Sequence, residues 1–236
     1  MAESVLFHTS TLSIFYDPAA ASSVEMLTTT IESILCRPAF EGSSPATNSP
    51  VLGIPRSIYW LILDISRLCR KHPRTTEDIR ELRRLDRGLR TWENALRASN
   101  SMQSDETHFD GMASLYIYCA RLLLTWIDAA DEAVPSNQEP VWKCLQEVIA
   151  NLRHTDESMG VARRFLLRWP LLILGHAVTN EDEINLLEEV LKNIWETSKW
   201  GDVKMTWQKV KGMWRHQHGI NLSKRQRLHL LLQTSL

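Results

Sequence analysis

The sequence predicts an all-α protein, a single multi-helix domain of roughly eight or nine helices. Apolar residues recur with a period close to that of a helix along most of the chain after residue 50. Alternation of apolar and polar residues, which would indicate half-buried strands, is nearly absent. Residues typical of helix starts precede several of the apolar stripes. Together these patterns favour helices throughout.

Residues 1–50 are predicted to form an N-terminal arm, and residues 51–236 the helical domain. The first 23 residues are weakly patterned, and the arm's one predicted helix comes next. Its apolar residues are Val24, Leu27, Ile31 and Leu35. Residues 37–50 include three prolines and several serines, so a loop is expected there.

Amphipathic helices are predicted over the next hundred residues. Their apolar stripes span residues 58–69, 79–96, 112–127 and 142–152. Thr75 and Thr76 provide a start signal for the second helix, whose buried face is expected to begin at Ile79. The third opens with the capping pair Thr107 and Asp110, and Trp142 is expected on the buried face of the fourth.

The stretch "RWPLLILGHAVTN", residues 168–180, predicts a buried central helix followed by a capped one. Pro170 lacks an amide hydrogen and disfavours helix at the residue before it, so a helix begins or kinks here. The run to Val178 is apolar on all sides, as in a buried helix, and is far too short to span a membrane. Asn180 with Glu183 predicts the next N-cap, and two amphipathic stripes follow over residues 184–195 and 203–214.

Composition excludes several classes of protein. The chain has 236 residues and a net charge of −1, so no overall field attracts it to DNA or acidic membranes. Its N-terminus resembles neither a signal peptide nor a mitochondrial presequence, which predicts an intracellular protein. Phosphate-binding loops, nucleophile elbows and zinc-protease motifs are missing, so no cofactor is expected.

No metal site is predicted. The four cysteines lie 33, 50 and 25 residues apart, whereas zinc sites use ligands two to four residues apart. Three of them fall on apolar faces and are expected to be buried thiols. His216 and His218 lie two residues apart and would not share a helix face, so a solvated helix end is favoured.

Arginines crowd the polar side of the helix expected after Thr76. Acidic residues are interleaved among them, which favours a solvated face over a nucleic-acid interface. The arginines are Arg80, Arg83, Arg84, Arg87 and Arg90. A second basic cluster, "KRQR" at residues 224–227, is compatible with a nuclear import signal and also with chance.

Three stretches together resemble the fungal-specific transcription factor domain family. "PVLGIPRSIYWLILDISRLCR" (50–70) is similar to the start of a long helix in that family, and "GMASLYIYCARLLLTW" (111–126) to its central helix. Residues 169–214 resemble its C-terminal signature, a Trp-Pro-Leu apolar helix, an acidic helix and a helix ending in Val-x-x-x-Trp. The three occur in the family's order.

The resemblance implies an all-α regulatory domain that follows a binuclear zinc cluster in nuclear regulators of fungal metabolism. The N-terminus here has neither the cysteines nor the basic run of that cluster, so no DNA-reading residue is carried over. No direct nucleic-acid binding and no membrane contact are expected.

Three explanations stay open. The first is a regulator-like nuclear protein, linked to secondary metabolism, that acts through an effector, a protein partner or self-association. The second is a cofactor-free cytoplasmic enzyme of secondary metabolism, a cyclase or isomerase of pericyclic type, in which an apolar helical pocket holds the reactive conformer. The third is a truncated product of a longer regulator. The regulator-like protein is placed first because the resemblance covers most of the chain.

Four residues are the candidate ligand-binding set for an apolar small molecule: Tyr116, Arg121, Trp169 and His176. They lie on or beside the two most apolar predicted helices and combine hydrogen-bond donors with stacking surface. Core packing is the alternative role for each of them, or a salt bridge for Arg121.

Overall fold

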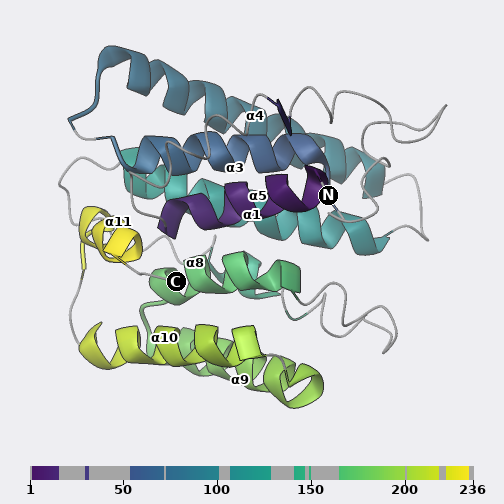
Figure 1. Cartoon of the computed structure of the whole chain (residues 1–236), viewed down its shortest axis with the longest axis vertical. Helices are drawn as coiled ribbons and strands as arrows, with labels where there is room; N and C mark the ends of the chain where they lie inside the picture. The colour runs from purple at the N-terminus through teal and green to yellow at the C-terminus, as the bar shows by residue number, and fades with distance from the viewer. Residues whose placement is uncertain are drawn as a thin grey trace. The chain divides into compact units, whose positions relative to one another are not determined.

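The structure, a computed structural model, describes residues 2–15, 30–31, 54–71, 73–100, 107–128, 141–146, 149, 165–199, 201–217 and 222–233. All regular structure in these ranges is helical, which confirms the all-α prediction. The α-helices are α1 (Ala2–Leu12), α3 (Arg56–Cys69), α4 (Thr76–Asn100), α5 (Thr107–Asp128), α8 (Arg168–Ala177), α9 (Glu181–Ser198), α10 (Gly201–Gln217) and α11 (Lys224–Gln233). Residues 30–31, 141–146 and 149 are also helical, and the described ranges include the short 3-10 helices η1 (Ser13–Phe15) and η2 (Phe165–Leu167) (Figure 1).

The chain divides into two compact units. Unit 1 comprises Met1–Ala113 and Leu232–Leu236, and unit 2 comprises Ser114–Leu231. The change of unit falls within α5. The predicted division after residue 50 lies outside the described residues and stays a prediction, as does most of the helix expected over residues 24–35.

Helix α1 was not expected from the sequence. It packs along α3 in unit 1 (Figure 1), with Phe7 edge-on to Tyr59 at a centroid separation of 5.7 Å. Its buried hydroxyls return to its own backbone: Ser10 Oγ donates to Leu6 O at 2.8 Å and Thr11 Oγ1 to Phe7 O at 2.7 Å. A hydroxyl that donates to a carbonyl of the preceding turn can be buried at little cost in free energy. The face of α1 that carries these hydroxyls is therefore buried, although it looks polar in the sequence.

Helix α4 packs on α3 through a face that begins later than predicted. Leu85, Leu89 and Leu96 are buried, whereas Ile79 in the first turn is 46% exposed. The expectation that Ile79 joins the core is therefore wrong, because the packed face starts beyond the first turn. Close approach of the helices is set by Gly88, since a Cβ there would lie 3.0 Å from a methyl carbon of Leu61.

The start of α4 is fixed by a reciprocal cap, as the Thr75 signal predicted. Asp78 Oδ2 accepts from Thr75 N and Thr75 Oγ1 at 2.9 and 2.8 Å, and Asp78 N donates to Thr75 Oγ1 at 3.2 Å. The Lys71 ammonium binds the other carboxylate oxygen at 2.8 Å. Lys71, and next the Thr75 donors, lower the pKa of Asp78 to about 2. The cap thus keeps a charged carboxylate at the positive end of the helix.

Unit 2 is built around α8, whose residues from Trp169 to Ala177 are all buried. Helix α10 contacts both α8 and α9 (Figure 1). Gly175 allows the first of these contacts, because a Cβ there would lie 2.7 and 2.8 Å from the two methyl carbons of Val210. The predicted cap of α9 is confirmed: Asn180 Oδ1 accepts from Glu183 N at 2.8 Å.

Candidate ligand site on helix α8

The sequence places α8 in the interior by leaving it no polar face. The helix begins at Arg168, and Pro170 occupies its first turn, where a missing amide hydrogen costs no helical hydrogen bond. The only ionisable side chain after Arg168 is that of His176 in the last turn. The helix therefore presents two polar aromatic groups to the core, Trp169 near its start and His176 near its end.

Tyr116 on α5 and Trp169 form a stacked pair. Their ring centroids lie 5.3 Å apart with an interplanar angle of 20°. The Tyr116 hydroxyl donates to Leu166 O at 2.5 Å, which ties α5 to η2. Both side chains are fully or almost fully buried, so two of the four candidate residues meet in one aromatic stack.

The Trp169 indole N–H has no acceptor among the described residues. The side chain is 1% exposed, and its Nε1 atom is out of reach of solvent. A buried donor left without an acceptor costs roughly 1–3 kcal/mol relative to a paired one. This N–H is therefore a donor to which a bound molecule or a buried water would contribute an acceptor.

His176 follows Trp169 on α8 by seven residues, or about two helical turns. It is 1% exposed. Burial, and next the positive charge of Arg227, lower the pKa of His176 to about 3. The imidazole is accordingly neutral at physiological pH, and so weak a base is poorly matched to proton abstraction.

Arg121 is placed apart from the stack. It is half-buried on α5, five residues after Tyr116. Five residues correspond to about 140° around a helix, so the two side chains leave α5 on different sides. Whether any of the four residues binds a ligand stays a prediction.

The carboxyl end of α8 is held by two residues that sequence reasoning did not assign to the site. Trp214 Nε1 donates to Gly175 O at 3.1 Å, and Arg227 Nη1 donates to His176 O and Ala177 O at 3.1 and 3.3 Å. These bonds satisfy carbonyls that a helix end leaves without partners, and the guanidinium also complements the helix dipole.

The sequence singled out Arg227, but for a different role. The residue belongs to the basic cluster 224–227, which suggested an import signal. Ser223 and Gln226 form a reciprocal cap at the start of α11, with Ser223 N donating to Gln226 Oε1 at 2.8 Å and Gln226 N to Ser223 Oγ at 3.2 Å. The cap fixes the register that directs Arg227 toward α8.

Replacing Arg227 with alanine is expected to lower the free energy of unfolding by about 1.5–3 kcal/mol, the usual range for hydrogen bonds to a charged group. It should also raise the pKa of His176, which stays below its usual value because burial is the larger cause. Urea unfolding and NMR titration of the imidazole measure the two effects. Arg227→Lys keeps the charge but lacks the guanidinium fork, so its free energy of unfolding should lie between those of the unchanged chain and of Arg227→Ala. Arg225→Ala, at an exposed neighbouring arginine, is the control. Equal losses for Arg227→Ala and Arg225→Ala would contradict the capping role.

The structure describes three of the four cysteines. Cys69, Cys119 and Cys144 are buried free thiols, as predicted, whereas Cys36 lies outside the described ranges. Burial raises the pKa of Cys69 to about 12 and that of Cys119 well above its usual value. Within the same ranges, no three His, Cys, Asp or Glu side chains gather as metal ligands would. None of the described helices has the length and apolarity needed to cross a membrane.

Comparison with known proteins gives one match. The fungal specific transcription factor domain matches residues 14–225, which include every described helix from α3 to α10. No curated protein and no solved structure matches the chain. Because the matched range covers most of the 236 residues, the chain belongs to the fungal specific transcription factor domain family.

Proposed function

We propose that this chain is a regulatory protein that binds an apolar small-molecule effector along α8 in unit 2 and passes the signal to a protein partner. Its role within the family would be regulation rather than DNA reading, in the nucleus and linked to secondary metabolism. The family supports a regulator-like role. The small-molecule effector, the protein partner and the link to secondary metabolism are parts of the proposal that go beyond the family match.

The observation that carries the effector site is the Trp169 indole N–H. It is buried, it has no acceptor among the described residues, and its ring stacks on Tyr116. Such a donor in apolar surroundings suits a mostly apolar molecule with one carbonyl or ether oxygen. The neighbouring His176 is neutral, so the site would add no charge to the ligand.

The enzyme alternative gets less support from the same geometry. A cofactor-free cyclase or isomerase needs at least one group that stabilises developing charge. His176 has a pKa of about 3, and the Tyr116 hydroxyl is already donated to Leu166 O. The Trp169 N–H is a neutral donor without an acceptor among the described residues, which fits recognition better than catalysis.

The test is thermal unfolding of the purified chain with and without an apolar extract of a fungal culture. A ligand at about 100 times its Kd adds roughly 2.7 kcal/mol, which corresponds to a Tm rise of about 5–10 °C for a chain of this size. Trp169→Phe keeps an aromatic ring, although a smaller one, and removes the N–H, so it should lose most of the rise. Trp142→Phe makes the same change at a side chain that is 45% exposed and should keep the rise.

Mass spectrometry of the mixture separates the two functions. An extract component retained unchanged supports an effector site, whereas a new product would make the chain an enzyme. Equal Tm rises in both tryptophan variants would place the ligand elsewhere, and no rise with any fraction would reject the effector site.

A further inference from the structure

The outer face of α4 carries three arginines that form no ion pair with the described acidic residues. Arg80, Arg83 and Arg87 are all exposed and are spaced as one helix face. None of the three forms an ion pair within 4.0 Å in the described part of the chain. The face lies opposite the buried leucines of α4, away from the side that packs on α3.

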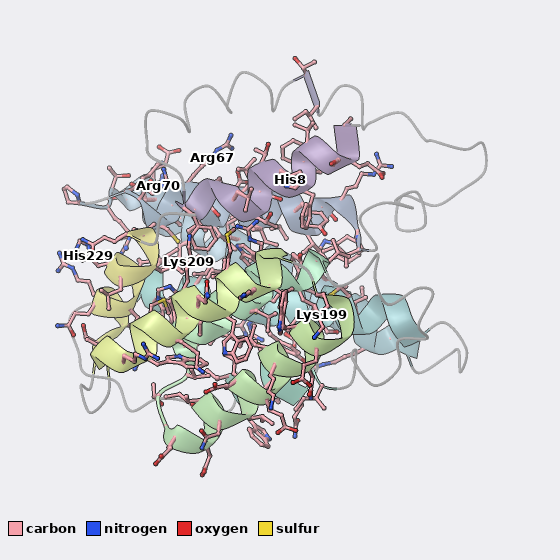
Figure 2. The ribbon with its side chains drawn as sticks, turned by 60° about the horizontal axis from the view of Figure 1, so that its bottom comes forward. His8, Arg67, Arg70, Lys199, Lys209 and His229 are labelled. Atoms are coloured by element: carbon pink, nitrogen blue, oxygen red, sulfur yellow. The ribbon has the colours of Figure 1, made fainter. Side chains whose placement is uncertain are left out.

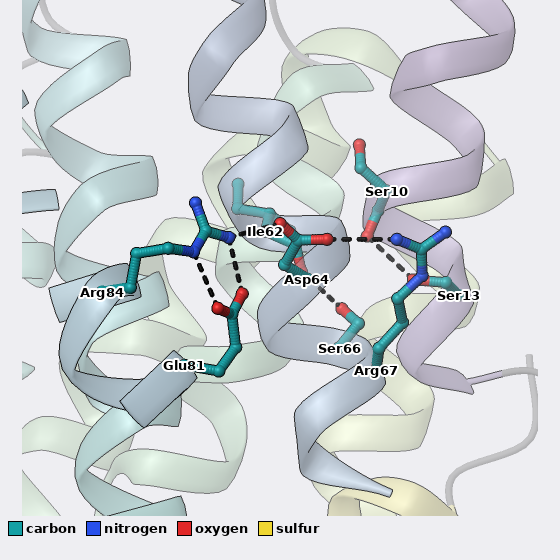
Figure 3. A network of polar contacts seen from close by, with 8 residues as sticks. All are labelled: Ser10, Ser13, Ile62, Asp64, Ser66, Arg67, Glu81 and Arg84. Carbon is teal, nitrogen blue, oxygen red and sulfur yellow. Dashed lines mark hydrogen bonds and ion pairs between the residues drawn. The ribbon is translucent and has the colours of Figure 1, made fainter. Parts of the chain in front are cut away.

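The other arginines of α4 are all paired. Arg84 binds Glu81 through two nitrogens at 2.7 and 2.6 Å and Asp64 of α3 at 2.9 Å (Figure 3). Two further pairs follow the helix register: Arg90 with Asp86 at 2.8 Å and Arg97 with Glu93 at 2.5 Å. Glu81, Asp86 and Glu93 are therefore engaged by other arginines of α4 and, among the described residues, form no ion pair with Arg80, Arg83 or Arg87.

The position of Arg87 makes this concentration of charge costly. Its neighbours three and four residues away are Arg83, Arg84, Arg90 and Thr91, so it faces like charges on its own helix. Like charges at these spacings destabilise a helix. Such a cost, on side chains that stay exposed in the structure, points to a function outside the chain.

We propose that this face, Arg80, Arg83 and Arg87, binds an acidic amphipathic α-helix of a protein partner. Arginine forks pair with carboxylates through two parallel hydrogen bonds, which fixes orientation as well as charge. Seven residues of helix span about 10 Å, so carboxylates spaced at i, i+4 and i+7 on the partner match the row. Ile79, 46% exposed at the edge of the face, provides an apolar contact.

A nucleic acid fits the same face less well. Sequence-independent DNA binding usually engages about 6–10 phosphates, and three arginines on a chain of net charge −1 supply fewer contacts. A phosphate backbone also makes no apolar contact with Ile79, whereas an amphipathic helix can place an apolar side chain against it.

The inference rests on the proposed function, because it names the chemistry of the partner that the regulatory protein would engage. The probe is a fluorescein-labelled helical peptide of about 20 residues, with glutamates at i, i+4 and i+7 and one leucine beside them. Binding is measured by fluorescence anisotropy at low ionic strength, where surface charges act most strongly.

The triple variant Arg80→Gln, Arg83→Gln, Arg87→Gln should weaken binding of this peptide at least about tenfold. Its matched control is Arg90→Gln, Arg97→Gln, Lys192→Gln, which removes the same charge from exposed cations that are already paired. The control should change binding less than about twofold. Circular dichroism checks that both triple variants keep the helical fold.

Four results would overturn the inference. These are no binding of the peptide, equal weakening in both triple variants, tighter arginine-dependent binding of a duplex DNA of about 20 base pairs, and arginine-dependent self-association in sedimentation. The last would make a second copy of the chain the occupant. Loss of peptide binding with an intact effector response rejects this inference alone, whereas the reverse rejects only the effector site.

Discussion

Acid should destabilise this protein through the buried His176 from about pH 6.5 downward. The histidine has a pKa of about 3 in the folded chain and near its usual 6.5 when unfolded. Between these values the unfolded chain binds a proton that the folded chain does not. Stability from His176 is therefore complete above about pH 6.5 and falls by up to about 1.4 kcal/mol for each pH unit below it.

Urea unfolding at a series of pH values measures this slope. His176→Gln should flatten it between about pH 6.5 and pH 4.5, because the amide cannot take up the proton. His8→Gln, at an exposed histidine of α1 (Figure 2), is the matched control and should leave the slope as it is. A slope unchanged in His176→Gln would mean that the buried imidazole does not govern acid unfolding.

Gly175→Ala should destabilise unit 2 by forcing α8 and α10 apart. The added methyl would lie 2.7 and 2.8 Å from the Cγ atoms of Val210, which are close to the α10 backbone and cannot turn away together. Overpacking of this kind costs about 1–3 kcal/mol, or roughly 2–4 °C of Tm for each kcal/mol. The Trp214 hydrogen bond to Gly175 O should weaken with it, since the helices must move apart.

The second substitution Val210→Ala separates this clash from a general loss of stability. It removes both methyl carbons, so the double variant should be more stable than the sum of the two single effects predicts. Gly212→Ala on α10 is the control, because its Cβ would meet nothing within 4 Å. That change should stabilise by about 0.4–1 kcal/mol. Simple additivity of Gly175→Ala and Val210→Ala would argue against the close contact.

The sequence predicted elements whose local signals agree with their surroundings. The apolar run of α8, the Asn180 cap of α9 and the Thr75 start of α4 each follow from neighbouring residues alone. Helix α1 did not, because Ser10 and Thr11 look solvent-facing until their hydroxyls are seen to bond within the helix. Burial of such residues depends on a neighbour, α3, that lies far along the chain.

Exposed apolar residues were the other source of error. Ile79 and Trp142 fit the apolar stripes of their helices but are 46% and 45% exposed. Both lie in the first turn of a described helical segment. Periodicity predicts which face of a helix is apolar, but it does not predict how far along the helix the packing partner extends.

The candidate site was predictable in its aromatic part and not in its polar part. Tyr116 and Trp169 were chosen for their place on apolar helices, and the structure stacks them. Trp214 and Arg227 act through bonds to residues 39 and 51 positions earlier, a separation at which sequence periodicity carries no information.

The capping of α8 from later helices also has a consequence for synthesis of the chain. The carbonyls of His176 and Ala177 accept hydrogen bonds from Arg227, 51 and 50 residues downstream. At roughly 5–20 residues per second, a ribosome adds that length in about 3–10 s. During this interval the most apolar segment of the protein exists without its final cap, so the nascent chain offers chaperones an apolar target until α11 is made.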